Sequence, residues 1–233
     1  VTNDDGGTSL AGSLGWCIDD IVTGPDVAPP YFIEFDLPAG QEVIAPNITW
    51  PAINQEIKFD GFSQPDSKVP GLKDPVTGDH MKPGVCGAEI NNSMGMAFGL
   101  NVISGGDSTV IRGLSIVGFN AGINMDNVNV VRVEGCHIGI DRDGSGSLPN
   151  IDGIFSDFCQ FGVIGGKEVY TKNIISGNTS GTGIVLNDSR NFVVHNNYIG
   201  VDRLGLVALA NAEGISIQGT SDNNLIGGKI ADR

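Results

Sequence analysis

The fold is decided by the stretch Gly183-Ile-Val-Leu-Asn-Asp-Ser-Arg-Asn-Phe-Val-Val-His-Asn-Asn-Tyr-Ile199, because its opening phrase recurs along the chain. Each copy begins with a glycine followed by leucine or isoleucine. The five copies start at Gly99, Gly122, Gly153, Gly183 and Gly214, at intervals of 23, 31, 30 and 31 residues. Repetition of this kind is typical of solenoids, in which each unit buries its apolar face against its neighbours.

Two further apolar positions follow each copy at nearly constant distances. Apolar and polar residues alternate around them, which is the period of a strand with one buried face. Three short strands per unit, separated by Gly, Asn, Asp and Ser corners, predict an all-β chain folded as a parallel β-solenoid. Like residues should then align in three internal columns: Leu100, Ile123, Ile154, Ile184 and Ile215; Ile111, Val133, Ile164, Val194 and Ile226; and Ile116, Ile138, Ile175 and Ile199.

The repeats carry two kinds of insertion. Residues 138–150 match residues 199–211 at an offset of 61, whereas the unit between them has its own insertion at residues 165–173. We therefore expect a repeat of two coils, with two kinds of outward loop alternating along the stack.

The chain is interpreted as one domain, residues 1–233, with three zones. Residues 1–38 form an N-terminal cap and the first strand, residues 39–98 form irregular early coils, and residues 99–233 form regular coils that continue beyond the chain end. Ten of the eleven prolines lie at or before Pro83, and proline is kept to edges and loops of sheets. The C-terminal end is predicted to have no cap.

The cap is predicted to be an amphipathic helix over Ser9–Val22. Leu10, Leu14, Cys17, Ile18 and Ile21 would share its apolar face. The first strand is placed at Tyr31–Leu37.

Charge and composition exclude several partners. The formal net charge is −14, which would repel a phosphate backbone, so nucleic acid is excluded. No apolar run is long enough for membrane insertion. The cysteines lack the spacing of a zinc site, and they are either paired in one or two disulfides or buried as small apolar residues: Cys17, Cys86, Cys136 and Cys159.

Several phrases carry a resemblance to a known group of proteins. They are the run Asp4–Ile18, Phe59-Asp-Gly-Phe-Ser-Gln-Pro65, Asn173-Ile-Ile-Ser-Gly-Asn178 and Tyr198-Ile-Gly-Val-Asp-Arg-Leu-Gly205. Together they resemble the right-handed parallel β-helix repeat proteins of bacterial surfaces and secretions. The resemblance implies a pectin-lyase-like fold and an extracellular or cell-surface location.

The catalytic phrases expected of enzymes with that fold are not found. A galacturonan hydrolase would carry Asn-Thr-Asp, Gly-His-Gly and Arg-Ile-Lys phrases, and the Asp-Asp pairs at residues 4–5 and 19–20 lie in the cap region. A lyase needs an arginine or lysine base beside carboxylate-bound calcium. No arginine column is expected to meet an aspartate cluster in register.

The sequence predicts a ligand site at Asp141, Asp143 and Asp202, with Ca²⁺ as a candidate ligand, because the carboxylates of Asp141 and Asp143 alternate as in calcium loops. The sister loop keeps Asp202 but has Leu204 in place of Asp143. The competing interpretation is that Asp141 and Asp202 hydrogen-bond their own turns.

Other polar and aromatic residues receive structural interpretations. His137 and His195 are expected on the solvated surface near one corner, and some of Phe155, Phe158 and Phe161 are expected to turn into the core. Asparagines at the corners would tie successive turns together: Asn178, Asn196, Asn197 and Asn211.

These observations favour a non-enzymatic structural or adhesive module without a resident cofactor. It would self-associate end to end or bind a surface polysaccharide. The alternative is a polysaccharide lyase or glycoside hydrolase.

Overall fold

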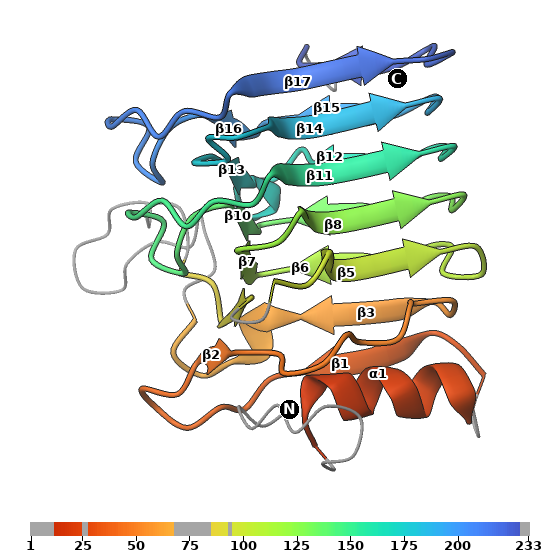
Figure 1. Cartoon of the computed structure of the whole chain (residues 1–233), viewed down its shortest axis with the longest axis vertical. Coiled ribbons are helices and arrows are strands. Elements are labelled where there is room, and N and C mark those ends of the chain that lie inside the picture. Colours follow the sequence, from red (N-terminus) through yellow and green to blue (C-terminus); the bar gives the residue numbers. More distant parts are fainter. Residues whose placement is uncertain (1–11, 25–27, 68–84, 93–94, 229–233) are drawn as a thin grey trace.

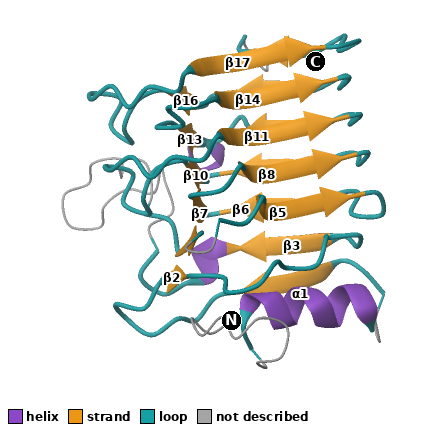
Figure 2. Cartoon of the chain, viewed as in Figure 1, coloured by secondary structure: helices purple, strands orange, loops and turns teal. Residues whose placement is uncertain are grey.

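A computed structural model of the chain describes residues 12–24, 28–67, 85–92 and 95–228. The chain is a parallel β-solenoid, in which successive strands pass through three parallel sheets before the next coil begins. Figure 1 shows the coils stacked as rungs, with helix α1 across the end nearest the N-terminus. Strands and the turns between them make up almost all of the remaining described structure (Figure 2).

Each sheet collects strands from successive coils. The seven-stranded sheet contains, in spatial order, β1 (Tyr31–Glu34), β3 (Ile57–Asp60), β6 (Val110–Arg112), β9 (Arg132–Glu134), β12 (Val163–Gly165), β15 (Val193–His195) and β18 (Leu225–Ile226). The six-stranded sheet contains β2 (Val43–Ile44), β4 (Ala88–Asn91), β7 (Leu114–Val117), β10 (His137–Ile138), β13 (Ile174–Ile175) and β16 (Tyr198–Ile199). The five-stranded sheet contains β5 (Phe98–Ile103), β8 (Ala121–Asp126), β11 (Asp152–Asp157), β14 (Thr182–Asn187) and β17 (Glu213–Gln218).

The predicted columns are confirmed by the strand register. Ile154 pairs with Ile123 on one side and Ile184 on the other, and the remaining members of that column align in the same way. In the other two sheets, each member of the predicted column is likewise paired with the next member on the adjacent strand. Their side chains form one continuous core along the solenoid up to the last described coil, where Ile226 is 41% exposed. The three-strand coil was therefore correctly predicted from the repeats.

The cap helix is shorter than predicted. Helix α1 spans Leu14–Thr23, because Ser13 is its N-cap and the Ser13 side chain accepts a hydrogen bond from the Trp16 N–H at 3.1 Å. Leu14 and Ile18 are buried in the core as predicted, whereas Leu10 lies outside the described residues. No helix in the described part of the chain is long and apolar enough to cross a membrane.

All four cysteines are free thiols, and three of them are buried. Burial raises the pKa of the Cys136 thiol to about 12 and that of Cys86 well above its ordinary value. The cysteines therefore pack as small apolar residues, which is one of the two alternatives that the sequence left open.

A ladder of buried asparagine amides crosses the coils beside the six-stranded sheet. The Asn178 amide oxygen accepts the Asn150 backbone N–H at 3.1 Å, and its amide nitrogen donates to Asn211 at 2.9 Å. Asn150 in turn accepts from the Phe119 N–H at 3.0 Å. A second rung joins Asn173 to Asn197. The prediction that corner asparagines tie successive turns together is thus confirmed for this ladder.

We predict that Asn178→Ala destabilises the protein by about 3 kcal/mol, because it leaves buried donors and acceptors of two neighbouring coils unpaired. Urea denaturation of the purified variant measures this. Asn120→Ala, at an exposed turn position, is the matched control and should change stability by less than about 0.5 kcal/mol. Equal effects of the two substitutions would contradict the ladder's role.

Candidate functional site

Two hairpin loops project from the six-stranded sheet, after β10 and after β16. Ile140 bridges Ser147 in the first loop, and Val201 bridges Ala208 in the second. The loops leave alternate coils, since β13 lies between β10 and β16. They nevertheless touch, because the Arg203 N–H donates to the Gly144 carbonyl at 3.0 Å. The expected two-coil spacing of these loops is confirmed.

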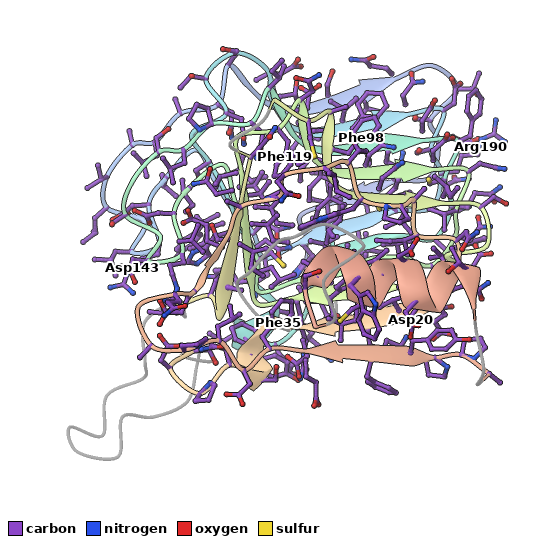
Figure 3. All side chains as sticks on the ribbon, turned by 60° about the horizontal axis from the view of Figure 1, so that its bottom comes forward. Asp20, Phe35, Phe98, Phe119, Asp143 and Arg190 are labelled. Atoms are coloured by element: carbon purple, nitrogen blue, oxygen red, sulfur yellow. The ribbon has the colours of Figure 1, made fainter. Side chains whose placement is uncertain are left out.

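The three predicted ligand-binding residues lie in these hairpins. The Asp141 carboxylate accepts the Ser145 N–H at 2.9 Å, and that of Asp202 accepts the Leu206 and Val207 N–H groups at 2.7 and 3.0 Å. The Val207 and Leu206 N–H groups hold the pKa of Asp202 below its ordinary value. Asp143 is exposed on the outer side of its loop (Figure 3). Asp141 and Asp202 thus cap their own turns.

Arg142, which lies between Asp141 and Asp143, has a different role. Arg142 reaches back to the early coils, where its guanidinium lies 2.9 Å from the Asp66 carboxylate, 3.3 Å from that of Glu42 and 3.1 Å from the Cys86 carbonyl. Within the described ranges, no group of three or more acidic, histidine or cysteine side chains is placed to hold a metal ion. The hairpin arginine therefore anchors the loop to the first part of the chain.

The prediction for the histidines was wrong. His137 belongs to β10 and His195 to β15, so they lie on different sheets. His137 is only 2% exposed, since the hairpin folds over it and its Nδ1 lies 3.1 Å from the Asp141 carbonyl. Burial lowers the pKa of His137 to about 4. Alternation along the strand predicted that the His137 side chain points outward. Its burial is explained by the hairpin after β10, which covers it.

The expectation that some of the phenylalanines of the third regular coil turn into the core was also wrong. Phe158 is 59% exposed and Phe161 is 54% exposed, whereas Cys159 between them is buried. Phe155 is half-buried on β11, between the inward residues Ile154 and Ser156. The period-two pattern does not extend through this corner, because both exposed rings lie on residues with a left-handed backbone.

The outer face of the seven-stranded sheet carries a groove of about 280 Å³. It crosses β1, β3, β6 and β9 and is lined by Phe32, Lys58, Phe59, Asp60, Val110, Arg112 and Glu134. Phe32 is the most exposed of these residues, at 69%. A second hollow, of about 370 Å³, adjoins it between α1 and β1 and shares Phe32.

A column of alternating charge runs along this groove. Asp60 on β3 pairs with Arg112 on β6, and Arg112 pairs with Glu134 on β9. Arg112 binds Asp60 with both arms, at 2.9 Å from Nε and 2.6 Å from Nη2. The hydrogen bonds that Arg112 donates to the Asp60 carboxylate are the main reason that the pKa of Arg112 is raised. A single arginine thus lies in register between two acidic residues, an arrangement that the search for an arginine column beside an aspartate cluster did not reveal.

Neighbouring pairs complete the groove. Arg132 donates from Nε to Glu134 at 2.8 Å, and Lys58 lies 2.7 Å from Glu56. Both arginine side chains remain almost half exposed, so their outer N–H groups can reach a ligand. The groove thus offers donors and acceptors whose charges are already balanced within the protein.

A signal for this column is present in the sequence. The phrases Phe59-Asp-Gly, Ile111-Arg-Gly and Val133-Glu-Gly each place a charge directly after a core residue and before glycine. Gly113 and Gly135 have φ of +67° and +61°, and a Cβ on either would meet the Phe62 ring at 2.8 Å. Aligning the charges as well as the apolar positions would have identified the groove.

We predict that His137 makes the protein less stable as pH falls. Its pKa in the folded state, about 4, is below the ordinary value of 6.5, so the unfolded chain binds the proton more readily and stability is lost as pH falls from about 6.5 toward 4. Between pH 7 and pH 5, the wild type should lose about 2 kcal/mol more than His137→Gln. Urea denaturation at both values tests this, and parallel losses in the two proteins would contradict it.

Comparisons of the chain with protein-family models, with curated proteins and with solved structures each find no match.

Proposed function

We propose that the protein is a non-enzymatic adhesive module of the cell surface or secretion, which binds an extended, uncharged polysaccharide across the outer face of its seven-stranded sheet. One observation carries the proposal: the charged side chains in the groove alternate in sign and are paired with each other. Such pairs hold donors and acceptors in place for the hydroxyl groups of a sugar.

The shape of the groove suits a polymer. It crosses four adjacent strands, which at about 4.8 Å per strand gives a length of roughly 14 Å along the solenoid. It lies on a sheet face, where a chain can enter and leave at either end. The exposed Phe32 ring offers an apolar surface at one end of it.

The charge balance favours an uncharged ligand. Lys58, Arg112 and Arg132 are matched by three acidic partners, Glu56, Asp60 and Glu134. The chain as a whole has a formal charge of −14, which would repel an acidic polymer. A neutral polysaccharide is not subject to this electrostatic repulsion.

The resemblance to secreted and surface repeat proteins supports an extracellular location. The pairing of both groove carboxylates with arginines supports a binding role, because a proton donor or acceptor works best when it is not already committed to a strong ion pair. We place the protein outside the cell as a binding module on these two grounds.

We predict that a neutral polysaccharide retards the protein in native affinity gels. The probes are soluble β-glucan and galactomannan, with polygalacturonate as the acidic comparison. Arg112→Ala should weaken binding at least tenfold, since it removes a charged donor from the centre of the groove. Lys167→Ala, on an exposed loop outside the groove, is the control and should bind as the wild type does. Retardation by polygalacturonate alone, or by none of the probes, would refute the proposal.

A polysaccharide hydrolase is the second candidate function, and one observation favours it. Asp60 and Glu134 lie two strands apart, so their backbones are separated by about 9.6 Å. This backbone spacing is close to the roughly 6.5–9.5 Å that separates the acid and base carboxyl groups of inverting glycosidases.

We predict that no new reducing ends form when the protein is incubated with the polysaccharide that it binds, because both carboxylates are held by arginines. A reducing-sugar assay measures this. Release of reducing ends by the wild type, together with its loss in both Asp60→Asn and Glu134→Gln, would establish the hydrolase instead.

A further inference from the structure

The corner between the five-stranded and seven-stranded sheets has the same backbone in three successive coils. Its first and last residues are left-handed in each: Asn127 and Val130, Phe158 and Phe161, and Asp188 and Asn191, with φ between +45° and +61°. The corners stack in register, since the Val130 N–H donates to the Gln160 carbonyl at 2.9 Å and the Phe161 N–H to the Arg190 carbonyl at 3.1 Å. Three different sequences therefore adopt one conformation.

The residue types at these positions differ in how well they suit that conformation. Asparagine and aspartate enter the left-handed region most readily of the residues with a side chain, whereas bulky and β-branched residues are disfavoured there. The coil after Phe158 and Phe161 has Asp188 and Asn191 at the same places, and the coil before has Asn127. The chain itself thus contains better residues for this turn than the two phenylalanines.

Burial does not compensate for the unfavourable backbone. More than half of each ring's residue surface remains in solvent, and the inward position between them is taken by Cys159. Apolar surface left in water contributes nothing to folding. The two phenylalanines therefore lower stability in two ways, through the unfavourable left-handed backbone and through apolar surface left in water. Backbone strain of this kind concentrates at functional positions.

The rings adjoin the outer face that carries the groove. Phe161 lies two residues before Val163 on β12, and Val163 pairs with Arg132, the arginine that donates to the groove residue Glu134. Val193 and Leu225 continue the apolar column beyond Val163. We define the corner patch as Phe158, Phe161 and Val163. Through Val163, which pairs with Arg132, the patch adjoins the strand at the end of the charged groove.

The cation at the edge of the patch is paired, whereas the neighbouring aspartates Asp126 and Asp157 stack on each other in register. Arg190, from the next coil, lies 3.3 Å from the Asp222 carboxylate and donates to the Thr220 carbonyl at 3.2 Å. Figure 3 places Arg190 on the side of the molecule opposite the Asp143 hairpin. An uncharged ligand with apolar faces fits this surface better than an ionic one does.

We propose that Phe158 and Phe161 form an aromatic platform for the same uncharged polysaccharide, whose chain extends from the groove to the corner patch. This inference rests on the proposed function. Sugar rings present C–H groups on their faces, and these carry the partial positive charge that the electron-rich face of an aromatic ring attracts. The groove supplies hydrogen bonds to hydroxyls, and the platform supplies stacking.

The test replaces both rings with the residue that the neighbouring coils use, as Phe158→Asn with Phe161→Asn. The melting temperature of this double variant should rise by at least about 3 °C, because two strained residues are relieved. Its affinity for the neutral polysaccharide that retards the wild type should fall about tenfold in affinity gels. A rise in stability together with a loss of binding separates a ligand contact from damage to the fold.

Two further variants act as controls. Val130→Asn relieves the same backbone strain without removing a ring, so it should raise the melting temperature and change affinity by less than threefold. Phe161→Tyr keeps a ring and should bind within threefold of the wild type.

The outcomes distinguish this inference from the proposed function. If Arg112→Ala loses binding while the double Asn variant binds as the wild type does, the groove function stands and the platform is overturned. If the wild type binds none of the polysaccharides, both are overturned. If the wild type self-associates in size-exclusion chromatography and the double variant does not, the patch is an interface between copies, and the platform is likewise overturned.

Discussion

The hydrogen-bonded register between coils is the constraint on which the rest of the structure depends. Parallel strands about 4.8 Å apart place each residue next to its equivalent in the coils before and after. A residue in this fold therefore has two neighbours that are determined by the repeat. Core columns, asparagine ladders, charge pairs and corner strain all follow from that one arrangement.

Like residues stack well only where they are apolar or can donate and accept at once. Isoleucine on isoleucine fills the core, and an asparagine amide accepts from the coil before it and donates to the coil after it, as Asn178 does. Charged residues of one sign would repel at this spacing. The column of Asp60, Arg112 and Glu134 accordingly alternates in sign, and this alternation is what leaves the groove neutral but rich in hydrogen-bonding groups.

The repeat also supplies an internal reference for every position. Asp188 and Asn191 represent what the corner accommodates easily, and Phe158 and Phe161 depart from it at a cost in stability. His137 is a second departure, because a titratable ring is buried under a loop that only alternate coils possess. Stability alone therefore does not explain the residues at positions where one coil differs from its neighbours.

Much of the architecture follows from the sequence alone, because period-two alternation and constant spacing between apolar positions admit few other folds. The three columns, the cap around Leu14 and Ile18 and the turns closed by Asp141 and Asp202 are all local or repeated features. The start of α1 required the Ser13 cap, which the apolar pattern of the helix does not reveal.

Only the tertiary structure decided which side chains meet across coils. Asp60 and Arg112 are 52 residues apart and pair because an intervening coil of irregular length returns the chain to the same sheet. Likewise, His137 is buried and Phe158 is exposed because of a covering loop and a left-handed corner, and alternation along a strand encodes neither.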